Sequence, residues 1–140
     1  MSAINDRTTG RSLNQLLALG FGAVYALVGV LGFFVSTHVA FAGKHGASLL
    51  GFDVNGLHSV VHLLIGIALI TAARTQVAAK ATNLTIGSVY VLLAVLGPVI
   101  NDTVLDVIGL NGPDHFLHLA SGVLLVAVAL VGDKKRALVA

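Results

Sequence analysis

The sequence predicts an all-α fold: a bundle of four transmembrane helices, built from two parallel two-helix repeats, with both termini in the cytoplasm. Three observations support this prediction, namely an apolar composition, four apolar stretches and an internal repeat. Of the 140 residues, 56% are hydrophobic and 10% are charged, and the mean hydropathy is +0.96. Soluble domains carry about 25% charged residues. We therefore expect one integral membrane domain, residues 1–140.

Four apolar stretches mark the expected helices, at roughly residues 13–36, 56–73, 84–100 and 113–132. A long outer loop, residues 37–55, separates the first two. Each stretch is close to the ~20 residues that cross a ~30 Å hydrocarbon layer as a helix. Their apolarity is continuous rather than alternating, which favours helices over barrel strands. The first stretch also exceeds the 7–15 residues of a secretory signal core, so we expect it to be retained.

The distribution of charge predicts the orientation. Seven of the eight basic residues fall on the side of the termini: Arg7, Arg11, Arg74, Lys80, Lys134, Lys135 and Arg136. That side has two acidic residues, whereas the other has Lys44 and four Asp residues. Cytoplasmic loops carry such a basic excess. The pI near 9.3 thus reflects membrane topology and contact with membrane lipid rather than nucleic-acid binding.

An internal repeat relates the two halves of the chain. Gly22-Ala-Val-Tyr25 recurs as Gly87-Ser-Val-Tyr90 at an offset of 65, and the segment from Asn55 recurs from Asn111 at an offset of 56. Two helices per repeat return the chain to its starting side, so the repeats are expected to be parallel. Glycines within the apolar stretches permit close helix contact.

The repeated segments Asn55-Gly-Leu-His58-Ser-Val-Val-His62 and Asn111-Gly-Pro-Asp114-His115-Phe-Leu-His118 place titratable side chains at two helix starts. Titratable side chains are costly to place in lipid, so we expect these to have a role. Asn55 and Asn111 suit the N-cap position. Residues four apart share one helix face, so His58 with His62 and Asp114 with His118 each form a pair.

If both faces turn inward, a metal site results at the outer ends of the second and fourth helices. The candidate ligands are His58, His62, Asp114 and His118, with His115 as a further candidate. Three imidazoles and a carboxylate suit a divalent transition metal such as Zn, Cu, Ni or Fe. Direct co-ligation requires the rings of His62 and His118 to lie within about 7 Å, given metal–nitrogen bonds of ~2.0–2.1 Å.

Other readings of the histidines stay open. Neutral imidazoles can hydrogen-bond a neighbouring helix and fix the packing, with Tyr25 and Tyr90 as candidate partners. His62 and His118 could instead ligate a haem in an electron-transfer protein. A small transporter or channel subunit is a third possibility. No nucleophile–base set and no phosphate-binding loop is visible, so the chain is not expected to be an enzyme.

The blocks around Tyr25, His62, Tyr90 and His118 resemble a family of small four-helix integral membrane proteins, mainly actinobacterial, classed as a domain of unknown function. The resemblance covers roughly residues 12–132. It implies a multi-pass protein of the bacterial plasma (inner) membrane and supplies no activity. The function expected is a structural or accessory membrane protein with a divalent metal site, either as a homo-oligomer or within a larger membrane complex.

Overall fold

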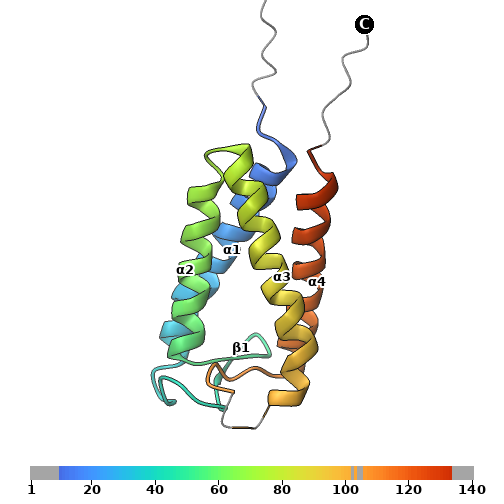
Figure 1. Ribbon diagram of the computed structural model, residues 1–140. Helices are drawn as coiled ribbons and strands as arrows, with labels where there is room; N and C mark the ends of the chain where they lie inside the picture. The colour runs from blue at the N-terminus through green and yellow to red at the C-terminus, as the bar shows by residue number, and fades with distance from the viewer. Residues whose placement is uncertain (1–9, 102, 104–105, 134–140) are drawn as a thin grey trace, which may run out of the picture.

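The computed structural model describes residues 10–101, 103 and 106–133, and its regular structure there is four helices and one β-hairpin (Figure 1). In chain order the elements are α1 (Leu13–Val35), β1 (Ala47–Leu49), β2 (Phe52–Val54), α2 (Gly56–Ala72), α3 (Gln76–Ile100) and α4 (Gly112–Val131). The all-α fold class is confirmed. Helices α1, α3 and α4 are long and apolar enough to cross a membrane, whereas α2 is a shorter apolar helix of 17 residues. The chain is thus consistent with a membrane protein.

Helix α3 begins earlier than its apolar stretch predicts, at Gln76 instead of residue 84. The hydroxyl of Thr75 accepts a hydrogen bond from the backbone N–H of Ala78 at 3.2 Å and so caps the helix. The first two turns are rich in good helix formers. Lys80 therefore lies on the exposed surface of α3 and not in the connection between helices. The apolar stretch marks only part of the helix, because helix propensity does not end where apolarity does.

The predicted outer loop contains a short antiparallel hairpin, in which Ala47 pairs with Val54. Its two-residue turn, Leu50-Gly51, has positive φ at both positions, +56° and +93°. This is the backbone of the tight hairpin turns that match strand twist. Three-residue strands are too short to show an alternating pattern in the sequence, so the hairpin was not predicted.

The helices pack chiefly in two pairs, α1 against α2 and α3 against α4, through contacts between glycines. A Cβ placed at Gly66 would lie 2.8 Å from the carbonyl oxygen of Gly22, and one at Gly87 would lie 2.8 Å from that of Gly122. Real side chains do not fit at such distances, so the backbones of each pair touch. Small residues allow this approach where lipid supplies no hydrophobic drive for association.

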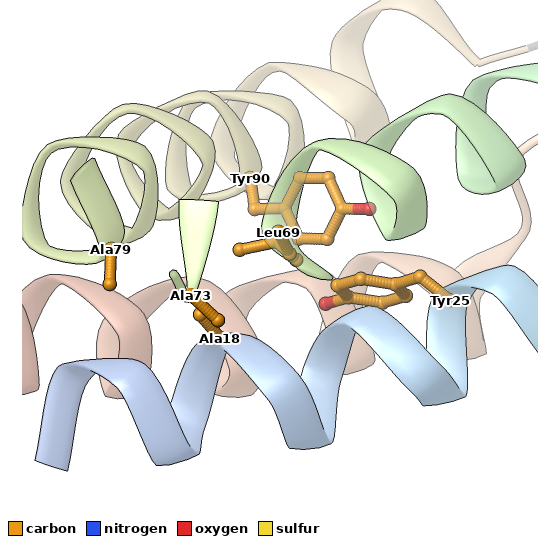
Figure 2. Packing of buried hydrophobic residues seen from close by; sticks show 6 residues of the cluster. All are labelled: Ala18, Tyr25, Leu69, Ala73, Ala79 and Tyr90. Atoms are coloured by element: carbon orange, nitrogen blue, oxygen red, sulfur yellow. The ribbon is translucent and has the colours of Figure 1, made fainter. Parts of the chain in front are cut away.

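The buried core between the pairs consists of small residues at the end of the bundle where α1 begins, and of larger residues further along the bundle. Figure 2 shows Tyr25 of α1 and Tyr90 of α3 side by side, with their ring centroids 5.4 Å apart. The remaining members of the cluster are Ala18, Leu69, Ala73 and Ala79. The two tyrosines thus lie where α1 and α3 meet.

A polar network joins the helices at the end where α1 begins and α4 finishes (Figure 1). The side-chain amide of Asn14 donates to Asp133 Oδ2 at 2.7 Å, and that of Asn83 donates to Asn14 Oδ1 at 2.9 Å. Both asparagines are fully buried. Such bonds between helices are favoured in lipid because the alternative is an unpaired polar group. The network places the first turn of α1 beside the end of α4.

The predicted charge asymmetry falls partly outside the described residues. This holds for Asp6, Arg7, Asp102, Lys134, Lys135 and Arg136. Of the remaining basic residues on the expected inner side, Arg11, Arg74 and Lys80 are at or near the ends of α1, α2 and α3 that lie together.

Replacing Gly66 with Ala is expected to destabilise the bundle. A Cβ there would lie 2.5 Å from the backbone N of Ala26 and 2.8 Å from the carbonyl of Gly22, so α1 and α2 must separate. Overpacking of this kind costs about 1–3 kcal/mol. Thermal unfolding of the detergent-purified chain measures the loss. Gly20→Ala is the control, because nothing lies within 4 Å of a Cβ there; equal losses in both variants would contradict the prediction.

The stability of the chain is expected to fall in acid because of Asp133. Slight burial tends to raise the pKa of this carboxyl, but hydrogen bonds led by those from Asn14 outweigh it and hold the pKa below the usual 3.8. A depressed folded-state pKa means that the stabilisation is present above the unfolded value and is lost as pH falls through the folded one. Unfolding midpoints at pH 7 and pH 3 test this, and Asp133→Asn should show the smaller difference between the two.

Candidate metal centre

The two predicted N-caps are confirmed, and they set the depth of the histidines. Asn55 Oδ1 accepts from the backbone N–H of His58 at 2.9 Å, while its side-chain amide donates to the carbonyls of Gly43 and Val107 at 2.8 and 3.1 Å. Asn55 is fully buried, and its hydrogen bonds hold the start of α2 against the loop that precedes it and the loop that follows α3. Asn111 caps α4 in the same way, through the N–H of Asp114 at 3.1 Å. The histidines that follow each cap lie within the first two turns.

Three of the predicted site residues converge. His58 and His62 of α2 and His118 of α4 are buried, with 2%, 7% and 4% of their surface exposed. One ring nitrogen from each lies within 4.8 Å of the other two. The ring centroids of His62 and His118 are 6.2 Å apart, which satisfies the separation of about 7 Å set by the sequence analysis for co-ligation. The inward-facing placement of both helix faces is therefore observed.

When the imidazoles are neutral, the hydrogen bonds of His58 determine which ring nitrogens of His58 and His62 carry a proton. Its Nδ1 lies 3.1 Å from the backbone carbonyl oxygen of Asp53, which can only accept, so Nδ1 must carry the proton. The Nε2 atom of His58 is then an acceptor, and Nε2 of His62, 3.1 Å away, donates to it. His62 consequently keeps an unprotonated Nδ1, for which the described residues supply no hydrogen-bond partner.

Two tyrosines complete a ring cluster to which all four helices contribute. Tyr25 of α1 contacts His62 of α2 edge-on, at 5.4 Å between centroids, and Tyr90 of α3 contacts His118 of α4 at 4.6 Å. From the sequence alone, these tyrosines were candidate hydrogen-bond partners of the histidines. The structure gives ring contacts with the histidines instead. The two buried hydroxyls lie near each other, with Ser121 near that of Tyr25, although neither meets the geometry of a hydrogen bond among the described residues.

Asp114 stands apart from the three histidines. Its Oδ2 accepts from the backbone N–H of Asn111 at 3.0 Å, which completes a capping box at the start of α4. The carboxylate is therefore already engaged, although Asp114 lines the same cavity as the histidines. It lies one helical turn before His118 and supplies negative charge next to the cluster.

His115 points away from the cluster, because it lies about 100° around α4 from Asp114. Its ring packs against Gly97 of α3, where a Cβ would lie 2.3 Å from its Nδ1. Both ring nitrogens are buried and lack a partner among the described residues. The geometry therefore gives His115 a packing position between α3 and α4.

A cavity of about 320 Å³ opens beside the cluster, between α1 and α4. Its inner wall carries Tyr25, His58, His62, Asp114 and His118. Its apolar walls come from α1, from Leu117 and from the hairpin: Val24, Leu27, Val28, Leu31, Leu49, Leu50, Phe52 and Val54. Sequence reasoning missed the contribution of the hairpin, since nothing local indicates that residues 49–54 cover the ends of two distant helices.

Sequence reasoning also missed the polar contacts of Asn14 and Asn83 at the opposite end. The only signal was the presence of an amide side chain at the edge of each apolar stretch. Their partners lie 69 to 119 residues away in sequence, so only the packing of the bundle reveals them.

Comparison with known proteins gives one family match. A family model described as Domain of unknown function (DUF4383) matches residues 15–131. The resemblance inferred from the repeated blocks is thereby confirmed as a domain of unknown function, while the actinobacterial distribution stays a prediction. The chain has no match among the curated proteins and none among the solved structures.

Asp114→Ala is expected to destabilise α4, because the backbone N–H of Asn111 loses its acceptor. Loss of a helix cap costs about 0.5–2 kcal/mol. Asp114→Asn should keep most of the stability, since its amide oxygen can still accept that bond. Thermal unfolding of the two variants side by side measures the difference. An alanine variant as stable as the wild type would show that the capping box is dispensable.

Proposed function

The chain belongs to the family described as Domain of unknown function (DUF4383), and we propose that it is an accessory, non-enzymatic membrane protein that binds one divalent transition metal at His58, His62 and His118. The observation that carries this proposal is the convergence of three buried imidazoles from two helices, with ring nitrogens within 4.8 Å of one another. Imidazole nitrogen suits Zn²⁺ and Cu²⁺ in particular.

Distances support a shared ion. Two nitrogens at ~2.0–2.1 Å from one metal are about 2.8–3.4 Å apart for bond angles between a right angle and a tetrahedral one. The Nε2 atoms of His58 and His62 are already 3.1 Å apart, and an ion between them would replace the hydrogen bond that joins them, with the proton of His62 moving to its Nδ1. His118 would have to close the remaining gap by a small rotation of its ring. The three histidines leave a fourth position for water or another small ligand.

The surroundings of the cluster suit a metal in two further ways. The bond from His58 Nδ1 to the carbonyl of Asp53 presents the Nε2 lone pair of that ring to the metal, as ligating histidines generally require. The carboxylate of Asp114 on the same cavity wall offsets part of the positive charge, which reduces the cost of placing an ion in a membrane.

The geometry favours a single ion over the two alternatives. A haem ligated by His62 and His118 needs a macrocycle between these rings, but His58 lies against His62 and Tyr90 lies against His118. A transport path would have to pass Leu69 and Leu125, which are fully buried in the bundle. Neither alternative has a specific observation in its favour.

We propose further that α2 spans the membrane with the other three helices. Its 17 residues reach the lower limit of about 17–25 for a spanning helix, and its backbone touches that of α1 at Gly22 and Gly66. Four spans, two parallel repeats and cytoplasmic termini in a plasma membrane then follow the charge pattern of the sequence. An acidic outer end would draw cations to the site. A homo-oligomer or a larger complex is compatible with this arrangement.

A metal-binding measurement tests the proposal. Purified chain, stripped with chelator and titrated with Zn²⁺ or Cu²⁺, should bind one ion and unfold at a higher temperature; at a hundredfold excess over Kd the stabilisation is about 2.7 kcal/mol. His62→Ala and His118→Ala together should weaken binding by more than about a hundredfold, since even outer-shell partners of a metal are worth 10–100-fold.

Two variants serve as matched controls. His115→Ala removes a buried imidazole of α4 that lies outside the cluster, and Asp114→Asn removes the carboxylate charge while keeping a capping oxygen. Both should retain one ion per chain. Unchanged affinity in the double variant, or substoichiometric binding by the wild type, would refute a site at these histidines.

A further inference from the structure

The β1–β2 hairpin lies at the end of the bundle where α2 and α4 begin, over the histidine cluster formed by His58, His62 and His118 (Figure 1). It belongs to the first outer loop, which is longer than the second because the offset between the repeats falls from 65 to 56 across it. Phe52 of the hairpin and Ile108 of the second loop are equivalent positions of the repeat, and each lines a space beside the histidines. The longer loop therefore gives the cluster a larger cover on one side.

The backbone of Asp53 in β2 joins the two helices that carry the histidines. Ser48 pairs with Asp53, next to the pair that closes the turn. Because hydrogen-bonded and non-hydrogen-bonded pairs alternate along an antiparallel ladder, the N–H and C=O of Asp53 point away from β1. Its carbonyl oxygen lies 3.1 Å from Nδ1 of His58 in α2, and its N–H lies near the carboxylate of Asp114 in α4. The hairpin thus rests on the starts of both helices.

The covers at this end separate the histidine cluster from the aqueous phase. All three histidines are buried, and both strands of the hairpin contribute to the wall of the adjoining cavity, through Leu49 and Val54. The gap between α1 and α4 faces hydrocarbon, because both helices are apolar enough to cross a membrane. Placing an ion in hydrocarbon is costly. An ion from the aqueous phase must therefore displace a cover at the outer end.

One of the two covers, the loop after α3, is held firmly in place. The side-chain amide of Asn55 and the backbone N–H of Gly43 both donate to the carbonyl of Val107, at 3.1 and 2.9 Å. Within the same loop, the carboxylate of Asp106 accepts from the N–H groups of the two residues that end it, at 3.0 and 3.2 Å, and these bonds are buried. The space between this loop and the histidines is only about 20 Å³. The loop is therefore packed onto the cluster.

The other cover, the hairpin, is attached more weakly. It has three residue pairs, and among the described residues its turn is hydrogen-bonded to α4 by one side chain, Asn111, whose amide donates to the carbonyl of Gly51 at 3.0 Å. This bond is exposed, so water can replace either partner. Leu50, in the same turn, is 92% exposed, and a cavity of about 320 Å³ lies on the inner side of the hairpin. Few packing contacts and exposed hydrogen bonds are typical of segments that open locally.

We propose that the hairpin is a lid that controls access of the metal ion to the histidine cluster, with the bond between Asn111 and Gly51 as its latch. The inference rests on the proposed function, since it concerns the route to that site. When the latch breaks, the hairpin lifts and the carbonyl of Asp53 leaves His58, so that water and an ion reach the imidazoles. Because the latch joins the same atoms with and without an ion, it governs the rates of entry and release and leaves the affinity unchanged.

Asn111→Ser tests the latch in the full chain reconstituted in lipid nanodiscs. Serine caps a helix about as well as asparagine, but it lacks the amide that reaches Gly51. Loss of one hydrogen bond shifts an opening equilibrium about two- to tenfold. Stopped-flow measurements with Zn²⁺ and a fluorescent zinc indicator should show entry and release faster by the same factor, with an unchanged Kd. Unchanged rates, or an altered Kd with an unchanged rate of entry, would contradict the latch.

Chemical labelling tests the lid without any metal. Diethyl pyrocarbonate modifies neutral imidazoles that meet solvent, and mass spectrometry gives the rate at each histidine. In the chelator-stripped chain, the histidine cluster should react about two- to tenfold faster in Asn111→Ser than in the wild type. His38 and His45 are already exposed, whereas His115 is held between α3 and α4 with both ring nitrogens buried. The reaction rates of these three controls should be the same in both chains.

The outcomes separate the lid from the metal site. Equal labelling of the histidine cluster in the two chains would overturn the lid, and so would an equal increase at His115, because it would show that the whole bundle has loosened. Asn111→Thr, which also keeps a capping oxygen and lacks the amide, is the second variant should Asn111→Ser fail to fold. A wild type that binds no Zn²⁺ would refute the proposed function and the route of the ion, whereas the labelling decides separately whether the hairpin opens.

Discussion

The backbone contacts of Gly22 with Gly66 and of Gly87 with Gly122 are the constraint on which the rest of the bundle depends. Each contact lies one helical turn from a ring of the central cluster, since His62 and His118 precede the second glycine of each pair by four residues. Close approach within α1–α2 and α3–α4 therefore brings Tyr25 onto His62 and Tyr90 onto His118. A side chain at any of these glycines would separate the rings as well as the helices.

Polar groups are gathered at the two ends of the bundle, and this follows from the cost of leaving them unpaired in hydrocarbon. At one end Asn14 bonds to both Asn83 and Asp133. At the other, Asn55 and Asn111 cap two helices and bind the loops and hairpin to them, in part through the carbonyl of Gly51. The histidine cluster lies just inside this second end. Its ring nitrogens at His62 Nδ1 and His118 Nδ1 are among the buried polar atoms without a partner in the described residues, and they are the reason to look for a ligand.

The family name carries no activity, so function has to be argued from the site. The cluster has the chemistry of a metal centre, because three imidazoles from two helices lie within reach of one another. An ion at Nε2 of His58 and His62 requires the proton of His62 to move to its Nδ1, for which the described residues supply no partner.

The sequence by itself determined the helical class, the apolar character of the segments, both N-caps and the pairing of His58 with His62, because these depend on local composition and on the 3.6-residue period. It also indicated that glycines within the apolar stretches permit close helix contact. The tertiary structure decided that His118 joins this pair while His115 packs on Gly97, and that Asp114 caps α4. It alone revealed that the hairpin covers the ends of two distant helices and that a cavity lies between α1 and α4. These features depend on how distant helices rotate and pack against one another, which a local pattern does not specify.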